Sequence, residues 1–548
     1  MSILIYSIIA LGYMAGFFFL FPKAGRKSWE GLIPFYNFYV VTKITQKPWW
    51  WTTLLIFPGV NVLMLMVFNS NLATVFGKRE LQDQVLAVLF PFVMFPVWGK
   101  GEIKFIGPVD RSKLKKSPAR EWGDAIVFAV IAASIIRTYF LEAFTIPTAS
   151  MEKTLLIGDY LFVSKMAYGP KIPQTPLSFP FAHHTLPGTE IPSYLEWMKL
   201  PYGRLPGFGE VDRNDIVVFN YPEGDTVTVE LQSNMSYNQL IRNYSILYGE
   251  KNARKYVWKG IPTGQQNTQA TNNLLGMFQR MGISEARSQK IVREGYDITV
   301  RPVDKREHYI KRCVAVPGDK IYIENAKLSI NDETAYIPPA FQYNYIIESR
   351  ALLNQNMIKD NLDINLQDSD PRQSLLNNTG PYIYELPMTL ESQNTMNGYN
   401  SVDAVNINMH FKQNSIEGSI FPNQPGTDWS VDNWGPLSVP VKGESVELNL
   451  ANLSFYERII EVYEGHKLRV VNGQILVDDE PTTSYTFEMD YYFMMGDNRH
   501  NSADSRFWGF VPENHIVGRA AFIWLSIDPE KTLFDGGLRF NRMFSIPE

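Results

Sequence analysis

Long apolar runs alternate with short polar segments in the first part of the chain. The runs are Ile3 to Phe21, Trp49 to Phe68 and the shorter Val85 to Trp98, which contains two prolines. Because a helix rises about 1.5 Å per residue, roughly 20 apolar residues are enough to cross a hydrocarbon core of about 30 Å. The pattern therefore predicts an N-terminal membrane region over residues 1–110, with about three candidate spans.

A further apolar run, Ala125 to Phe144, follows a cluster of lysine and arginine between Arg111 and Arg120. Basic residues that flank a span are usually retained in the cytoplasm. We therefore expect residues 111–146 to be a basic cytoplasmic segment followed by the last transmembrane helix. The chain beyond it is then expected on the extracytoplasmic side.

The hydrophobic pattern changes after this run. Short stretches rich in β-branched residues, bounded by Gly, Pro, Asn and Asp, replace the long runs and are typical of strands and turns. Polar stretches rich in Asn, Gln and Ser interrupt them, and insertions of this kind in loops cost little stability. The expected fold is a set of N-terminal transmembrane helices followed by a mainly-β extracytoplasmic catalytic domain with long insertions. Its parts are expected at 147–222, 301–330 and 462–548, with an insertion at 223–300 and an insertion or second β subdomain at 331–461.

Composition narrows the classes of function. The chain has 548 residues and a formal net charge of -5, so it lacks the basic excess that favours nucleic acid as a partner. Its single cysteine, Cys313, excludes an intrachain disulfide, and no CxxC or His/Cys spacing indicates a metal. We expect no cofactor, no metal and no nucleic-acid partner.

Ser150 lies shortly after the last apolar run, in the stretch PTASMEKTLLIGD, and is a candidate nucleophile. A serine becomes nucleophilic when a base lies within hydrogen-bond reach and donors stabilise the oxyanion that forms. His183, His184 and His500 are histidine candidates for that base, but none has the sequence frame of a Ser-His-Asp triad. A lysine is the other kind of base.

Two lysines are serious candidates. Ser150 and Lys153 form an S-x-x-K pattern, as in serine acyltransferases, although the chain lacks the K-T-G or K-S-G strand of that class. In an extended segment, residues three apart point to opposite faces, so Lys153 is expected to face away from Ser150. The second candidate is Lys311, in YIKRCVAVPGDK, whose apolar neighbours can desolvate an ammonium and lower its pKa.

Four stretches, taken in order behind a membrane span, carry a resemblance to a known family. They are PTASMEKTLLIGD from Pro147, RNDIVVFNYP from Arg213, YIKRCVAVPGDK from Tyr309, and MGDNRHNSADSRFWGFVP from Met495. Together they resemble the sequence boxes of bacterial type I signal peptidase, a membrane serine protease that removes signal peptides. Two positions depart from the family's pattern: Thr148 stands where serine is common, and Lys153 where proline is usual. The earlier spans and the two insertions lie outside the resemblance.

The resemblance implies a signal-peptidase-like β fold and a Ser/Lys dyad, with Ser150 as nucleophile and Lys311 as general base. It also implies oxyanion-stabilising and supporting roles for Thr148, Ser502, Asp504 and Arg506. The residues expected to line shallow substrate pockets are Phe144, Ile146, Met151, Leu155, Tyr309 and Ile310.

The expected location is the bacterial cytoplasmic (inner) membrane, as a multi-pass protein with its catalytic domain on the periplasmic side. A site held there meets peptide bonds that emerge near the membrane surface, and signal peptides end in small residues before their cleavage site. The expected partners are such preproteins, membrane lipid and the export machinery. Two alternatives remain open: an S-x-x-K acyltransferase of the penicillin-binding type, and a non-catalytic membrane-anchored binding protein.

Overall fold

The structure of the chain is a computed structural model. It describes residues 2–56, 60–108, 118–189, 191–228, 298–362, 381–410, 429–471, 473–529 and 536–548, together with a few shorter pieces between them. The described chain forms two compact units. One contains residues 1–140 and 172–204, and the other contains residues 141–171 and 205–548.

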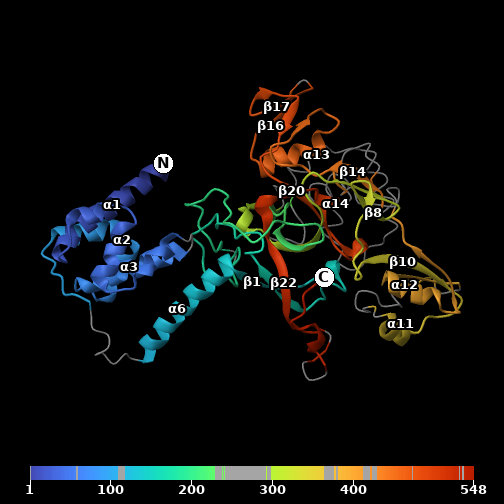
Figure 1. The fold of residues 1–548 in the computed structure, drawn as a ribbon, viewed down its shortest axis with the longest axis horizontal. Coiled ribbons are helices and arrows are strands. Elements are labelled where there is room, and N and C mark those ends of the chain that lie inside the picture. Colours follow the sequence, from blue (N-terminus) through green and yellow to red (C-terminus); the bar gives the residue numbers. More distant parts are fainter. Residues whose placement is uncertain are drawn as a thin grey trace. The chain divides into compact units, whose positions relative to one another are not determined.

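The first unit is helical up to residue 140 (Figure 1). Its elements are α1 (Ser2–Lys23), η1 (Ser28–Leu32), α2 (Tyr36–Thr45), η2 (Trp49–Ile56), α3 (Val60–Val75), α4 (Leu81–Leu89), α5 (Pro91–Lys100) and α6 (Pro118–Tyr139). Helices α1 and α5 pack closely because glycines face the contact. A Cβ atom at Gly16 would lie 2.5 Å from the Cβ of Phe95, so only glycine allows this approach.

Several predicted spans are divided in the structure. The apolar run Trp49 to Phe68 is split between η2 and α3, and Val85 to Trp98 is split between α4 and α5, which are bent by 117° at a proline that begins α5. The last run is helical only to Tyr139, since Leu141–Thr145 forms a strand. In the described part of the chain, no individual helix combines the length and apolarity needed to cross a membrane, whereas the bent pair α4 and α5 meets that test when taken together. Most of the basic cluster between Arg111 and Arg120 lies outside the described residues.

The second unit is built around an antiparallel sheet whose strand order differs from the sequence order. Its strands run in the order β1-β2-β22-β3-β6-β20-β21. Their bounds are β1 (Leu141–Thr145), β2 (Asp159–Ser164), β3 (Ile216–Asn220), β6 (His308–Ala315), β20 (Tyr491–Met495), β21 (Val511–Pro512) and β22 (Ile516–Ser526). Every residue of β3 is buried, which explains why its sequence is a continuous apolar run and does not alternate. The mainly-β character expected of this half of the chain is confirmed.

Smaller sheets extend this unit around a second apolar core that contains Trp434, Tyr491 and Phe493. Their strands are β7 (Lys320–Glu324), β8 (Lys327–Ile330), β9 (Glu333–Thr334), β14 (Trp434–Ser438), β15 (Ser445–Glu447), β16 (Leu468–Val471), β17 (Gln474–Val477), β18 (Glu480–Pro481) and β19 (Ser484–Thr486). The short helical pieces are α13 (Leu453–Arg458), η8 (Ile459–Tyr463), η10 (Glu513–His515) and η11 (Phe540–Arg542).

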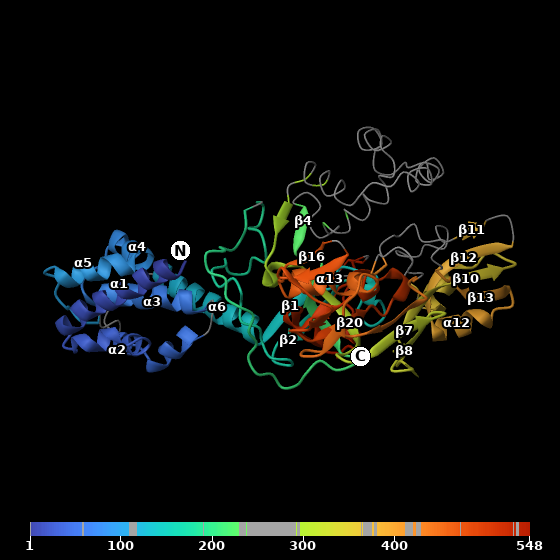
Figure 2. The same ribbon diagram turned by 90° about the horizontal axis from the view of Figure 1, so that it is seen from above.

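The polar stretch after residue 331 contains a folded sheet. Strands β10 (Gln342–Ser349), β12 (Tyr382–Thr389) and β13 (Val402–Ile407) pair in the order β11-β12-β10-β13, with β11 at Leu375–Asn377. Helices α11 (Gln355–Leu362) and α12 (Leu390–Asn397) accompany them, as Figure 2 shows for α12. Alternating apolar side chains along β10 and β12 build a core of their own, with Ile347 and Leu386 fully buried. We call residues 341–432 the insertion subdomain.

The other polar stretch, 223–300, lies mostly outside the described residues. Its two ends are held together, because β4 (Thr226–Thr228) pairs with β5 (Ile298–Val300) and places Thr228 opposite Ile298.

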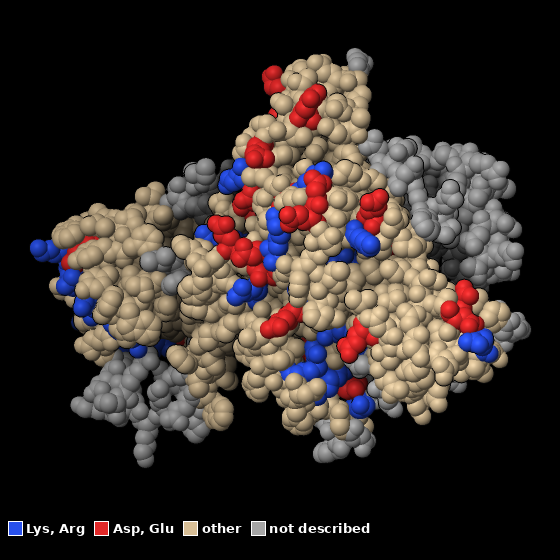
Figure 3. Space-filling view, turned by 45° about the vertical axis from the view of Figure 1, so that its right-hand side comes forward, with Lys and Arg blue, Asp and Glu red and all other residues tan. Residues whose placement is uncertain are grey.

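On the face shown in Figure 3, lysine and arginine are interspersed with aspartate and glutamate.

Candidate active site

Ser150 lies in a tight turn between two paired strands. Strand β1 pairs antiparallel with β2, and the connection between them contains the short 3-10 turn η4 (Ala149–Met151). Thr148, directly before this turn, is extended, exposed and makes no capping hydrogen bond with its side chain. The turn therefore places Ser150 two residues after Thr148, shortly beyond the end of the edge strand β1.

Lys311 meets Ser150 from strand β6. Its Nζ lies 2.7 Å from Ser150 Oγ and 2.9 Å from the carbonyl oxygen of Ile310. Only 4% of Lys311 is exposed, and the ring of Tyr309 lies 5.7 Å from Nζ. Burial lowers the pKa of Lys311 to about 8, against the opposing effect of the carboxylates of Asp504 and Asp497. A substantial fraction of the amine is therefore neutral near physiological pH.

The conformation around Lys153 differs from the extended one that we expected. Ser150 belongs to a 3-10 turn, and Lys153 has a left-handed backbone with φ of 70°. The strand that we expected around Lys153 begins only at Asp159, so side chains do not alternate with period two between Ser150 and Lys153. In the structure, the Ser150 hydroxyl oxygen accepts a hydrogen bond from Lys311 Nζ.

The loop after β20 holds the nucleophile turn from the other side. We call residues 496–506 the support loop; it contains η9 (Arg499–Asn501) and the start of α14 (Ser505–Trp508). Asn498 donates its backbone N–H to the Ser150 carbonyl (3.2 Å) and its side-chain amide to the Ala149 carbonyl (3.2 Å). A Cβ at Gly496 would lie 2.5 Å from the same Ser150 carbonyl oxygen and still closer to Ser502 Oγ. Glycine is thus required where the loop passes the nucleophile.

The three supporting residues expected from the sequence all lie in this loop and are buried. Asp504 and Arg506 form a bidentate ion pair, with Nε and Nη2 each 2.8 Å from a carboxylate oxygen. Burial by itself would raise the pKa of Asp504, but the Arg506 charge and the hydrogen bonds that the carboxylate accepts together outweigh burial and hold that pKa below its usual range. Ser502 lies beside Gly496, and its hydroxyl interacts with the Asp504 carboxylate and helps to lower the pKa of that group.

A buried ion pair that the sequence analysis did not identify links the support loop to the lysine strand. Asp497 accepts hydrogen bonds from Arg312 Nε (2.9 Å) and Nη2 (2.8 Å), and from the Thr154 hydroxyl (2.6 Å). Arg312 follows Lys311, so the pair fixes the strand position next to the base. A charged residue inside an otherwise apolar strand was the available signal for Arg312.

The residues expected to line substrate pockets separate into two groups. Phe144 and Ile310 are partly exposed at the margin of an apolar core, and the Phe144 ring packs 4.8 Å from His308. Ile146, Met151 and Leu155 are buried members of that core, and their expected place beside the substrate stays a prediction. Tyr309 stacks on Tyr221, with ring centroids 4.4 Å apart.

One group of possible metal ligands occurs in the described residues: Glu464, His466 and Glu488, with ligand atoms within 4.8 Å of one another. Both ring nitrogens of His466 already contact carboxylates, those of Asp478 and Glu488. The group is distant in sequence from the residues around Ser150 and is explained by these contacts.

Comparisons with known proteins show to which family the chain belongs. The family described as signal peptidase, peptidase S26, matches residues 119–373 and 439–525, which together make up more than half of the chain. The chain therefore belongs to this family of serine endopeptidases. It is a hydrolase that cleaves signal peptides. A second family, DUF5684, of unknown function, matches residues 29–108.

Individual relatives show how the similarity is distributed. Signal peptidase I from Buchnera aphidicola subsp. Baizongia pistaciae is 21% identical over 420 residues, covering 76% of this chain and 80% of the relative. Signal peptidase I from Buchnera aphidicola subsp. Acyrthosiphon pisum is 36% identical over 107 residues, or 18% of this chain and 34% of the relative. The protein of the same name from Haemophilus influenzae is 56% identical over 54 residues, 10% of this chain and 16% of the relative. Similarity is thus strong only over short stretches.

Proposed function

We propose that the protein cleaves signal peptides with a Ser150/Lys311 dyad. The observation that carries this assignment is the 2.7 Å contact between Lys311 Nζ and Ser150 Oγ at a buried lysine whose pKa is lowered to about 8. The neutral amine accepts the Ser150 proton while Oγ attacks the scissile carbonyl. The tetrahedral intermediate then collapses: the C–N bond breaks, and the Lys311 ammonium gives its proton to the leaving amine, which becomes the new N-terminus of the mature protein. The neutral Lys311 next takes a proton from water, which hydrolyses the acyl-enzyme, releases the carboxylate of the signal peptide and returns the proton to Ser150 Oγ.

The exposed Thr148 hydroxyl and the Ser150 backbone N–H are the proposed oxyanion donors. Thr148 supports this role because its side chain is not used to cap the turn. Asp504 and Arg506 hold the support loop, and the buried hydroxyl of Ser502 lies beside Gly496, next to the nucleophile turn, where it also interacts with Asp504. We assign Ser502 to orienting the lysine during the reaction.

The proposed substrate is an extended peptide lying along β1. This strand is at one end of the main sheet, and its described partner is β2 on one side only. An open strand edge can pair with an incoming extended chain through main-chain hydrogen bonds. Phe144 and Ile310 would then contact the small side chains that precede the cleavage site of a preprotein.

The proposed location is the bacterial cytoplasmic membrane, with several spans in residues 1–140 and the catalytic unit on the extracytoplasmic side. Support comes from the apolar composition of α1, α3 and α6 and from the basic cluster that precedes α6. Membrane lipid and the export machinery are the proposed partners beyond the substrate.

The dyad is tested with purified full-length protein in detergent and a synthetic preprotein. Ser150→Ala and Lys311→Met should each reduce cleavage by at least about 1,000-fold, because each removes one member of a nucleophile and base pair. Circular dichroism controls for folding. Substantial cleavage by folded Ser150→Ala would contradict the assignment. Labelling of Ser150 by benzylpenicillin would instead favour the S-x-x-K acyltransferase.

A further inference from the structure

The insertion subdomain contacts the support loop directly. The Gln342 backbone N–H, at the start of β10, donates to the Asp497 carbonyl (2.9 Å), and Gln342 forms a parallel bridge with Asn498. The guanidinium of Arg499 lies over the Phe341 ring at 4.6 Å. The far end of the subdomain reaches the same loop, since the Val431 carbonyl accepts a hydrogen bond from Arg506 (3.3 Å). Both ends of the insertion thus meet the loop that holds Ser150.

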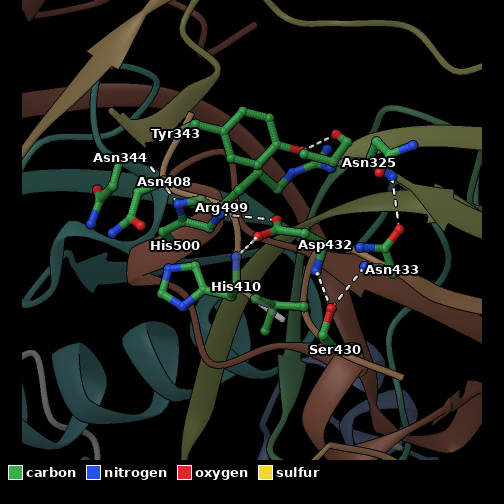
Figure 4. A network of polar contacts seen from close by, with 12 residues as sticks. Asn325, Tyr343, Asn344, Asn408, His410, Ser430, Asp432, Asn433, Arg499 and His500 are labelled. Atoms are coloured by element: carbon green, nitrogen blue, oxygen red, sulfur yellow. Dashed lines mark hydrogen bonds and ion pairs between the residues drawn. The ribbon is translucent and has the colours of Figure 1, made fainter. Parts of the chain in front are cut away.

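His500, in the support loop, forms hydrogen bonds with residues from both ends of the insertion subdomain (Figure 4). Its Nε2 lies 2.9 Å from Asp432 Oδ1, and its Nδ1 accepts the Asn344 backbone N–H at 3.1 Å. The side chains of His500 and Asp432 are both fully buried. The His500 ring also packs against Tyr343 on one side and His410 on another, with centroids 4.8 Å and 4.5 Å away.

The protonation of His500 follows from these contacts. Because Nδ1 accepts a hydrogen bond, it carries no proton, and the single ring proton lies on Nε2 and points to Asp432. Burial lowers the pKa of His500, and burial of Asp432 is outweighed by its hydrogen bonds, which hold the pKa of Asp432 below its usual range. The second Asp432 oxygen accepts the His410 backbone N–H at 2.7 Å. The pair is therefore satisfied as a neutral imidazole and a carboxylate.

The His500–Asp432 pair lies close in sequence to the residue that holds the nucleophile turn. Asn498, which donates to the carbonyls of Ser150 and Ala149, is two positions before His500 in the same short turn. A shift of His500 would therefore move Asn498 and the Ser150 backbone it holds. Asp432 and His410 fall between residues 373 and 439, where the match to the signal peptidase family is interrupted.

We propose that His500 is a positioning residue, and that the insertion subdomain, through Asp432 and Asn344, holds the support loop in the geometry that Ser150 and Lys311 need. This proposal rests on the Ser150/Lys311 dyad of the proposed function. It assigns the insertion a part in the chemical step, and it leaves substrate contacts to β1. Substitutions of His500 or Asp432 should consequently lower kcat and leave KM nearly unchanged.

The test compares three variants of the full-length protein in detergent, each assayed for cleavage of a synthetic preprotein. His500→Leu removes both hydrogen bonds and should lower kcat by about 30-fold or more with KM within about 3-fold, since small displacements of reacting groups cost up to about 100-fold. His500→Gln keeps a donor near the Nε2 position and should recover kcat to within about 5-fold of wild type. Asp432→Asn cannot accept from both His500 and His410, and should lower kcat by about 10-fold.

Asp403→Asn is the matched control, because Asp403 lies in the same subdomain and forms an exposed ion pair with Arg350. It should leave kcat within about 2-fold of wild type. Turnover is expressed per folded molecule, from near-UV circular dichroism well below each melting temperature. If His500→Leu does not fold, Asp432→Asn and His500→Gln decide the test.

A kcat within about 3-fold of wild type for folded His500→Leu, or for Asp432→Asn if His500→Leu does not fold, would overturn the proposal. So would a loss that appears in KM alone, or a His500→Gln variant no better than His500→Leu. Ser150→Ala, assayed beside them, separates the two levels. An active Ser150→Ala refutes the proposed function, whereas an inactive one beside a fully active His500→Leu refutes only the positioning role.

Discussion

At the scale of single residues, the protonation of Lys311 decides when the protein is active. A base must be neutral to accept the Ser150 proton, and the pKa of Lys311 is lowered to about 8. Below that pH the amine is protonated, so kcat/KM should rise by about tenfold per pH unit from pH 5.5 to 7.5 and level off near pH 8 to 9. Initial rates across this range measure the limb. A flat profile between pH 6 and 8 would rule out a lysine base with this pKa.

Lys153 illustrates how backbone conformation limits a substitution. Proline is the usual residue at this place in the family that the sequence resembles, but φ of Lys153 is 70° and proline requires about −65°. Lys153→Pro should therefore lower the free energy of unfolding by about 1–3 kcal/mol. Lys153→Gly is the control and should keep both stability and cleavage close to wild type, because glycine adopts positive φ without strain. Denaturant unfolding and peptide cleavage measure the two effects. An inactive but folded Lys153→Gly would return Lys153 to the list of candidate bases.

At the scale of elements, the support loop and the nucleophile turn touch through Gly496. The expected result of Gly496→Ala is a loss of about 1–3 kcal/mol in unfolding free energy and at least a tenfold drop in kcat, because the added methyl group displaces the Ser150 carbonyl or Ser502. Gly209→Ala is the matched control, since the nearest atom to a Cβ there is 3.9 Å away. Equal behaviour of the two variants would show that the loop adjusts freely around the methyl group.

The two insertions are expected to differ in importance. The insertion at 223–300 leaves the fold where Thr228 and Ile298 are already paired, so its ends are close together. Replacing residues 231–295 by a short Gly/Ser turn should leave cleavage of a short peptide within about 3-fold of wild type, because closing a short loop between paired strands costs little. A folded but inactive deletion variant would show that the segment builds part of the site.

At the scale of the whole molecule, the orientation in the membrane is open to a labelling test. In a Cys313→Ala background, a cysteine at Lys113 should be shielded from a membrane-impermeant thiol reagent in intact cells, and one at the exposed Glu333 should react. Cys313 itself is fully buried in a core strand, so its replacement leaves the surface unchanged. Labelling at Lys113 without labelling at Glu333 would reverse the proposed sidedness.

Local patterns in the sequence determined a large part of this protein. The apolar runs predicted the helical first unit, the β-branched runs predicted the mainly-β catalytic unit, and four motifs pointed to Ser150 and Lys311 as a pair. Such features depend on neighbours along the chain and on the chemistry that a reaction requires. The end of α6 at Tyr139 and the turn around Ser150 were predicted incorrectly, because strand pairing between β1 and β2 overrides local hydrophobicity there.

Only the tertiary structure decided which distant residues support the site. Arg312 meets Asp497 across 185 positions, and His500 meets Asp432 across 68. No local pattern encodes such pairs, because a buried charge is recognised only when its partner and its burial are known. The same holds for Ile146, Met151 and Leu155, whose apolar character fits either a pocket wall or a core. Packing against β2, β3 and β22 placed them in the core.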